Sequence, residues 1–178
     1  YYALVQTNFT LGADVAGSST EKPIQLQNGT LIIDNSSVND SLTTGGEDFE
    51  IPSTAMLEIR DGTLNVSGNS CIALDGKLFI SGGTLDMSGG ENDIEYSAGG
   101  EARLSISGGT LDVGGQVRRN LLTDAGILHY KQSGGDVTIG SYDASTDNNR
   151  GVFEVLNAGS EFVMSSGAVL KIENAQAN

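Results

Sequence analysis

The chain of 178 residues contains no tryptophan, one cysteine, one histidine and two prolines. The lone Cys71 excludes an internal disulfide, and one cysteine with one histidine supplies too few ligands for a usual zinc site. No stretch has the length and hydrophobicity of a transmembrane span. Because aromatic residues make up only 6% of the chain, its core must be aliphatic.

Basic residues are also scarce, since nine Lys and Arg oppose 23 Asp and Glu to give a net charge of −14. Nucleic acids and anionic membrane surfaces are bound through Lys and Arg, so this charge argues against nucleic-acid partners and membrane insertion. It favours solubility, tolerance of high salt or binding of divalent cations. An acidic, Lys-poor chain rich in Gly, Ser, Thr and Asn fits an extracellular or cell-surface location.

A phrase of ten residues is repeated along the chain. The three clearest copies are residues 57–66 (LEIRDGTLNV), 78–87 (LFISGGTLDM) and 104–113 (LSISGGTLDV). Further copies begin at Ile24, Tyr130 and Val155. The apolar residue at one fixed position marks each copy, and the markers are Leu31, Leu64, Leu85, Leu111, Val137 and Phe162. Their spacings of 33, 21, 26, 26 and 25 residues indicate a solenoid or an array.

Within a copy, apolar and polar residues alternate, which is typical of strands with one buried face. A glycine pair such as Gly82-Gly83 bends the chain between two such strands, because glycine accepts a positive φ. A third, variable segment follows, as in residues 71–74 and 94–96. Three short strands with their turns require roughly 20–30 residues, about one coil of a parallel β-helix.

We therefore predict an all-β, single-domain parallel β-helix solenoid, right-handed, with about six to seven coils of irregular 21–33-residue period. Residues 24–172 form the repeats, residues 1–23 an N-terminal partial coil or cap, and residues 173–178 a C-terminal tail. The alternative is an array of β-hairpins, with Asn28-Gly29 and Asp61-Gly62 as turns. The recurrence of the whole phrase favours stacking of like on like. The expected core contains Ile24, Leu26, Leu31, Leu57, Ile59, Leu64, Leu78, Ile80, Leu85, Leu104, Ile106, Leu111 and Val137.

Two late copies carry an amide where earlier copies have an apolar residue. These are Gln132 and Asn157. We expect both side chains to turn inward and form a short amide ladder, or else to mark a change of register.

The sequence lacks a convincing catalytic constellation. His129 should point outward between Leu128 and Tyr130, with no nucleophile motif near it. Cys71 should be a buried, inert thiol. The carboxylates that could serve glycoside hydrolysis read as solvated loop charges, and the only basic pair, Arg118-Arg119, falls in a variable turn. These carboxylates are Glu47, Asp48, Glu50, Glu91, Asp93 and Glu95. We expect the protein not to be an enzyme.

One loop has the spacing of a calcium site. Asp143, Ser145, Asp147, Asn149 and Glu154 place oxygen atoms at positions 1, 3, 5, 7 and 12, as in an EF-hand loop. The flanking residues resemble strands rather than helices, and Asp, Ser and Asn are common in any long turn. Calcium at these five residues is the only cofactor that the sequence suggests.

Stacked coils would align outward residues beside the markers into columns of Thr and of Asp or Asn, about 4.8 Å apart. The columns contain Thr63, Asn65, Thr84, Asp86, Thr110, Asp112, Asp136 and Thr138. Hydrogen-bonded, solvated ladders are the simplest interpretation. An ice-binding or glycan-binding face is the more specific interpretation, although acidic residues interrupt the flat Thr array that ice-binding proteins usually have.

The GGTLDV type of repeat, with Gly- and Ser-rich turns and a loose period, resembles the β-helical stalks of bacterial surface proteins such as autotransporter passengers and filamentous or large secreted adhesins. The resemblance covers residues 24–172 and implies an architecture, not particular functional residues. It implies a non-enzymatic extracellular structural or adhesive module, with glycans or a host or neighbouring cell surface as partners.

The alternative function is a carbohydrate-binding or carbohydrate-active β-helix. Sugar binding would draw on exposed aromatic residues, for which Tyr1, Tyr2, Phe79 and Tyr142 are the candidates. The segment Ala168–Ile172 still reads as a strand, and no capping helix is apparent at either end. We therefore expect a segment of a longer solenoid, or a chain that stacks end to end with its own copies in a fibre.

Overall fold

The computed structural model describes residues 3–12, 24–43, 47–142 and 150–174. Within these residues the chain consists of strands and turns without a helix, and all the strand pairs are parallel. The all-β prediction is confirmed. The hairpin array is excluded here, because neighbouring strands in it would run antiparallel. No helix that could cross a membrane occurs in this described part.

The strands form three larger sheets and one pair. The seven-stranded sheet contains, in spatial order, β18 (Glu161–Met164), β16 (Ile127–Gln132), β13 (Glu101–Ile106), β10 (Lys77–Ile80), β7 (Ala55–Ile59), β4 (Gly29–Ile33) and β2 (Phe9–Leu11). The six-stranded sheet contains β19 (Val169–Ile172), β17 (Asp136–Ile139), β14 (Thr110–Val113), β11 (Thr84–Met87), β8 (Thr63–Asn65) and β5 (Asn39–Ser41). The four-stranded sheet contains β15 (Val117–Arg119), β12 (Ile94–Tyr96), β9 (Ile72–Leu74) and β6 (Phe49–Ile51). The pair is β1 (Ala3–Val5) with β3 (Ile24–Leu26).

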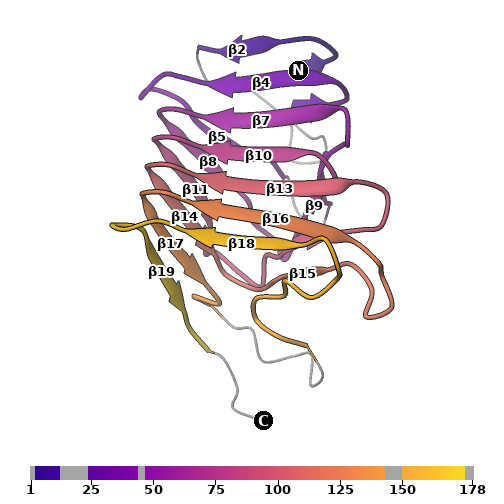
Figure 1. The fold of residues 1–178 in the computed structure, drawn as a ribbon. Coiled ribbons are helices and arrows are strands. Elements are labelled where there is room, and N and C mark those ends of the chain that lie inside the picture. Colours follow the sequence, from indigo (N-terminus) through magenta and orange to yellow (C-terminus); the bar gives the residue numbers. More distant parts are fainter. Residues whose placement is uncertain (1–2, 13–23, 44–46, 143–149, 175–178) are drawn as a thin grey trace.

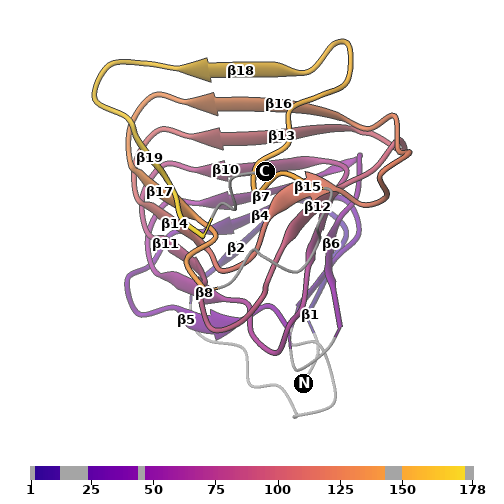
Figure 2. The same cartoon turned by 90° about the horizontal axis from the view of Figure 1, so that it is seen from below.

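From β7 to β15 the chain gives one strand to each of the three larger sheets in turn, and then repeats the passage one strand further along. We call one such passage a coil. Figure 1 shows the seven-stranded sheet as a ladder that follows the sequence from indigo to yellow. Seen along the stack, the three sheets lie around a common interior (Figure 2).

The interior is filled by the inward residues of every sheet, which form one apolar cluster. All thirteen core residues expected from the sequence are at most 2% exposed, which confirms the assignment of inward and outward positions. Like residues also stack on like, since Leu78 pairs with Leu57 and Leu104, and Leu85 pairs with Leu64 and Leu111. Such columns leave little freedom of register, because a slip by one residue would turn each apolar side chain outward.

Glycines with positive φ form the corner between the seven- and six-stranded sheets. Gly83 (φ 63°) and Gly109 (φ 72°) stand at equivalent positions, and the Thr110 amide donates to the Gly83 carbonyl at 2.9 Å. A Cβ on Gly109 would lie 2.5 Å from that carbonyl oxygen. The repeated glycine is therefore required by backbone conformation and by the close approach of successive corners.

The sequence analysis aligns Leu31 with Leu64 and so assigns the first repeat to the wrong corner of the coil. That alignment is wrong, because Leu31 pairs with Leu57 and Asp40 pairs with Leu64. Gly29, with a φ of 77°, bends the chain between β3 and β4, a different corner from that of Gly62. At both corners a glycine lies between two strands of alternating apolar and polar residues. The sequence pattern therefore does not distinguish one corner from the other.

The predicted alignment of the last repeat is wrong in the same way. Phe162 pairs with Tyr130, whereas Leu170 pairs with Val137. Gln132 is buried as expected, but its neighbour in the next coil is Met164, so no amide ladder with Asn157 forms. The Asn157 amide instead donates to the carbonyls of Asp124 and Gly126 and holds a turn.

Candidate functional site

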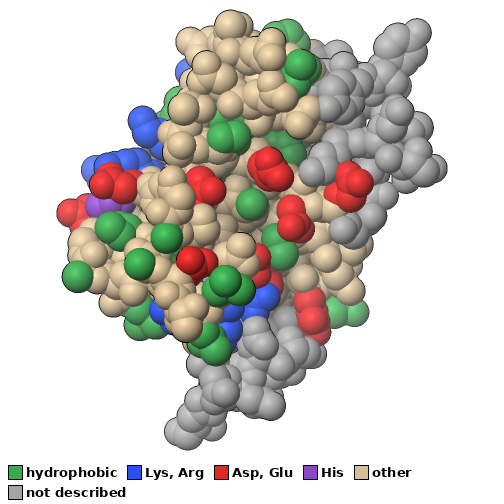
Figure 3. All heavy atoms as spheres, turned by 90° about the vertical axis from the view of Figure 1, so that its right-hand side faces the viewer, with side chains coloured by type: hydrophobic (Ala, Val, Ile, Leu, Met, Phe, Trp, Pro, Cys, Tyr) green, Lys and Arg blue, Asp and Glu red, His purple; other side chains and the backbone are tan. Residues whose placement is uncertain are grey.

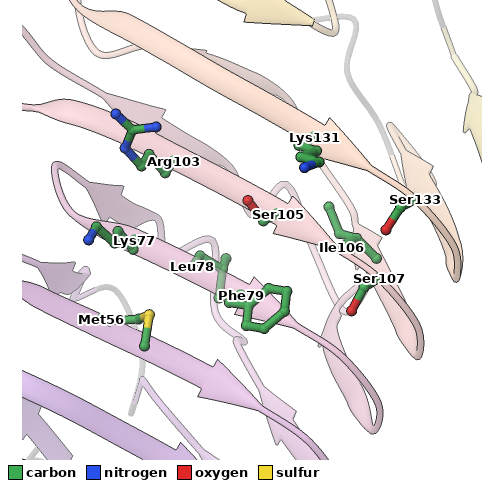
Figure 4. Close-up of a pocket in the computed structure, with 10 residues that line it drawn as sticks. All are labelled: Met56, Lys77, Leu78, Phe79, Arg103, Ser105, Ile106, Ser107, Lys131 and Ser133. Carbon is green, nitrogen blue, oxygen red and sulfur yellow. The ribbon is translucent and has the colours of Figure 1, made fainter. Parts of the chain in front are cut away.

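A groove of about 320 Å³ crosses the outer face of the seven-stranded sheet. It runs over β7, β10, β13 and β16, and its lining combines three cations, one aromatic ring and three hydroxyl groups (Figure 4). The lining residues are Met56, Lys77, Leu78, Phe79, Arg103, Ser105, Ile106, Ser107, Lys131 and Ser133. Its volume lies at the lower end of the range for small-molecule sites.

Strand alternation places the polar lining residues together. Lys77 is the register partner of Arg103, and Ser105 is the partner of both Phe79 and Lys131. These residues point outward because their strand neighbours fill the core. From ordinary strand spacing and rise, the Cα atoms of Lys77 and Arg103 lie about 5 Å apart, and those of Arg103 and Lys131 about 8 Å apart.

The charge of the groove is opposite to that of the chain. Three of its nine Lys and Arg residues line it, although the net charge is −14. Arg103 contacts Glu101 at 3.2 Å, an exposed pair that contributes little. Lys77 and Lys131 are exposed and make no ion pair with any described residue. Positive charge is therefore available here to an anion from solution.

His129 lies next to the groove, as the register partner of Arg103. The prediction that it points outward is confirmed, since Leu128 and Tyr130 on either side are buried. Its ring is not fully solvated, however, because Nδ1 lies 3.2 Å from a carboxylate oxygen of Glu161 and Nε2 lies 3.9 Å from Glu101. His129 thus contacts two carboxylates at the rim of the groove.

A second cluster lies on the outside of the four-stranded sheet. The Cys71 thiol and the carboxylates of Asp93 and Glu95 lie within 4.8 Å of one another. Arg118 contacts both carboxylates at 2.9 Å. Burial, reinforced by the charges of Glu95, Asp93 and Asp48, raises the pKa of the Cys71 thiol to about 12. Burial also raises the pKa of Glu95 above its ordinary value, although Arg118 opposes this effect.

This cluster corrects two sequence predictions. Asp93 and Glu95 are not solvated loop charges, because Asp93 is buried and Glu95 lies on β12. Arg118 and Arg119 do not lie in a turn but on β15. The carboxylates come from one coil and Arg118 from the next. Glu95 and Arg118 are 23 residues apart in the sequence, and the strand register makes them neighbours. In contrast, Glu47, Asp48 and Glu50 are exposed as expected.

The chemistry of the second cluster is that of a shared ion pair. Arg118 already supplies the positive charge that a divalent cation would bring to Asp93 and Glu95, and Cys71 holds its proton at neutral pH. Neither carboxylate lines the groove on the seven-stranded sheet, which contains no Asp, Glu or His among its lining residues. The lining of that groove therefore does not include the two carboxylates that glycoside hydrolysis requires.

Of the five predicted calcium ligands the structure describes only Glu154, since Asp143, Ser145, Asp147 and Asn149 lie outside the described residues. Glu154 is buried and its carboxylate contacts Arg119 at 3.2 Å and Arg150 at 3.3 Å. Burial alone would raise the pKa of Glu154, but hydrogen bonds from Arg150 and Arg119 lower it below its ordinary value. In this structure Glu154 anchors the segment after the loop to β15.

The outward columns of the six-stranded sheet align as predicted. Thr84 pairs with Thr63 and Thr110, and Asp112 pairs with Asp86 and Thr138. The Asp86 carboxylate accepts hydrogen bonds from the amide and hydroxyl of Ser88, which is typical of a local turn. The acidic members give this face a negative charge, and Figure 3 shows Asp and Glu side chains spread over another face of the molecule.

The groove was missed by the sequence analysis, although a signal for it exists. Lys77 and Arg103 both immediately precede the first leucine of their copies, so aligning the copies places two cations in one outward column. Of the aromatic residues proposed for sugar binding, Phe79 lines the groove, Tyr142 is exposed elsewhere, and Tyr1 and Tyr2 lie outside the described residues.

No protein-family model, curated protein sequence or solved structure matches this chain.

Proposed function

We propose that the coils form a right-handed parallel β-helix and that this is a non-enzymatic, extracellular structural and adhesive module. The regular passage through three sheets, with like residues stacked between coils, supports the β-helix. The acidic, Lys-poor composition supports the location. In this proposal the stack is a scaffold that joins others at its ends and binds partners on its outer faces.

The observation that carries the structural role is the state of the last described strands. Phe162 and Met164 on β18 continue the inward columns of Tyr130 and Gln132. They are 48% and 38% exposed, whereas Tyr130 and Gln132 are at most 1% exposed. On β19, Ile172 continues the column of Ile139 and is 46% exposed. Among the described residues, the core columns thus end in exposed apolar side chains, which form a surface suited to a partner.

The backbone of the same strands is also open. The Ser165 amide donates to the Gln132 carbonyl, so in a parallel ladder the alternate amides of Phe162 and Met164 point to the other edge of β18. No described strand pairs with that edge. An unpaired, apolar strand edge is a template for another strand.

The occupant that we propose is the opposite end of a second copy. At that end β2 is the outermost described strand of the same sheet, and its Phe9 is 47% exposed. Joining β18 of one copy to β2 of the next would continue the seven-stranded sheet as a head-to-tail contact, which propagates into a fibre. The acidic sides of neighbouring fibres would repel one another and keep the contact axial.

Two neighbouring substitutions on β18 test this contact. Met164→Lys places a charge at an inward position that is tolerable only while the end is open, and Val163→Lys places the same charge at an outward position. Sedimentation velocity over a range of concentrations should show association of the unmodified chain and of Val163→Lys, and a monomer for Met164→Lys. Circular dichroism should show that both variants fold.

Three outcomes would contradict the proposal. The first is an unmodified chain that remains monomeric at high concentration, and the second is equal association of the two variants. The third is release of reducing sugar from any of a panel of polysaccharides, abolished by Glu95→Gln, which would show an enzyme.

A further inference from the structure

We propose that the groove on the seven-stranded sheet binds an acidic saccharide, with Lys77, Arg103 and Lys131 contacting its anionic groups and Phe79 contacting a sugar ring. This inference rests on the adhesive part of the proposed function and names the ligand class that the outer face would recognise. It does not depend on the end-to-end contact, which lies on the backbone edge and inward face of β18.

The charge pattern favours an anion with well-separated charges. The three cations project from three adjacent strands, β10, β13 and β16, and Lys77 and Lys131 have no carboxylate partner among the described residues. Around them stand Glu101, Glu161 and Glu58, of which Glu58 is held by Arg60 at 2.8 Å. A groove with a few cations inside an acidic surround attracts the anionic groups of a short ligand, whereas the acidic surround repels the rest of a long polyanion.

The neutral lining suits a sugar ring and its hydroxyl groups. Figure 4 shows Phe79, Ser105 and Lys131 in a row on the same face, one on each of three neighbouring strands. The ring of Phe79 is half-buried on β10, so it offers one apolar surface from a fixed position. Ser105, Ser107 and Ser133 supply hydroxyls that can each donate and accept a hydrogen bond. Cations, one aromatic face and several hydroxyls are together complementary to a carboxylated or sulfated saccharide.

Single-stranded nucleic acid is the other polymer that combines anions with flat rings. Proteins that bind single-stranded nucleic acid rely on a continuous basic groove and on several aromatic residues that stack on successive bases. This groove has one aromatic residue, and the chain carries a net charge of −14. The saccharide is therefore the better match.

Calorimetric titration of the monomeric Met164→Lys chain tests the proposal without any contribution from stacking. Tetragalacturonate is the first probe, its fully methyl-esterified form is the neutral control, and a heparin-derived tetrasaccharide tests sulfate. We expect the acidic probes to bind and the ester to bind at least about tenfold more weakly, because the ester cannot form charge-assisted hydrogen bonds with the three cations. Added salt should weaken binding, because the cations are exposed. The stronger of the two acidic probes identifies the preferred anion.

Matched variants locate the site. Lys131→Gln should weaken binding about tenfold, whereas Lys171→Gln, the same change of charge on β19, should leave it unchanged. Phe79→Ala should weaken the ester and the acid alike. The proposal is overturned if no acidic probe binds, if ester and acid bind equally, if Lys131→Gln and Lys171→Gln have equal effects, or if oligothymidylate binds more tightly than the saccharides. None of these results would alter the sedimentation test of stacking.

Discussion

The hydroxyl of Tyr130 donates a hydrogen bond of 2.8 Å to Oε1 of Gln132, inside the apolar core. The Gln132 amide donates in turn to the carbonyls of Gly135 and Val169, the latter at the start of β19. One polar side chain thereby joins β16 of the seven-stranded sheet to β19 of the six-stranded sheet. A buried amide in an aliphatic stack is stable only because its polar atoms have partners.

The Tyr130–Gln132 pair should show strong coupling in a double-mutant cycle. Tyr130→Phe and Gln132→Met each leave a buried polar group without a partner, so each should lower the free energy of unfolding by about 1–3 kcal/mol. The double variant should cost less than the sum, because neither member of the pair then remains unsatisfied. Urea denaturation measures the three values. Additive effects would contradict the coupling, and Gln132→Met should also speed amide exchange on β19.

Gly109→Ala should destabilise the protein by about 2–4 kcal/mol, since alanine at positive φ is strained and its Cβ would overlap the backbone of the preceding corner. Gly89→Ala is the matched control, because no atom lies within 4 Å of the Cβ that it would add. It should be neutral or slightly stabilising. Thermal unfolding of the two variants compares them directly, and equal melting temperatures would show that the corners do not approach as described.

Glu154→Gln should lower the free energy of unfolding by about 3 kcal/mol at neutral pH, because Arg119 and Arg150 would lose their buried partner. The folded pKa of Glu154 lies below its ordinary value of 4.5. Its contribution is therefore present above that pH and is lost as the pH falls through the lower folded value. The difference between variant and parent should shrink in acid, and a constant difference between neutral and acidic pH would contradict the assignment.

Glu95→Gln is the corresponding change in the second cluster and should have a much smaller effect. Burial raises the pKa of Glu95, so the folded chain disfavours its charged form more than the unfolded chain does, although Arg118 opposes this effect. Any stability from its protonation is present at low pH and is lost as the pH rises through the folded value. With Arg118 still held by Asp93, the variant should stay within about 1 kcal/mol of the parent at neutral pH. Urea titrations at both pH values check this.

Cys71 should react with iodoacetamide about a thousandfold more slowly in the folded chain than in urea at about pH 8, since its pKa rises from 9.0 to about 12. Glu95→Gln should accelerate the reaction by removing one of the charges that disfavour the thiolate. Mass spectrometry of the alkylated fraction over time gives both rates. A folded rate close to the unfolded one would show a thiolate that the described geometry does not allow.

The sequence predicts the middle of this molecule well and its ends poorly, for a physical reason. Leu85 is placed correctly because period-2 alternation and a repeated corner glycine together determine its face and its stacking partner. Leu31 and Phe162 are misplaced because the corners of one coil use similar residues, so alternation fixes the face of a residue but not its sheet. Burial of Asp93 could not be predicted either, since it depends on Arg118 from the next coil.

The register of the strands also makes the length of the molecule adjustable. Thr84 and Thr110 are partners in neighbouring coils, and so are Leu85 and Leu111. A chain that lacks residues 85–110 would join Thr84 to Leu111 and would leave every remaining column with an equivalent neighbour, shorter by one strand spacing of about 4.8 Å. Duplication of the same segment would lengthen the stack by the same step. Unequal recombination between copies of the repeat would therefore also change the groove, because loss of residues 85–110 removes Arg103 and Ser105 from its lining and duplication adds a second copy of both.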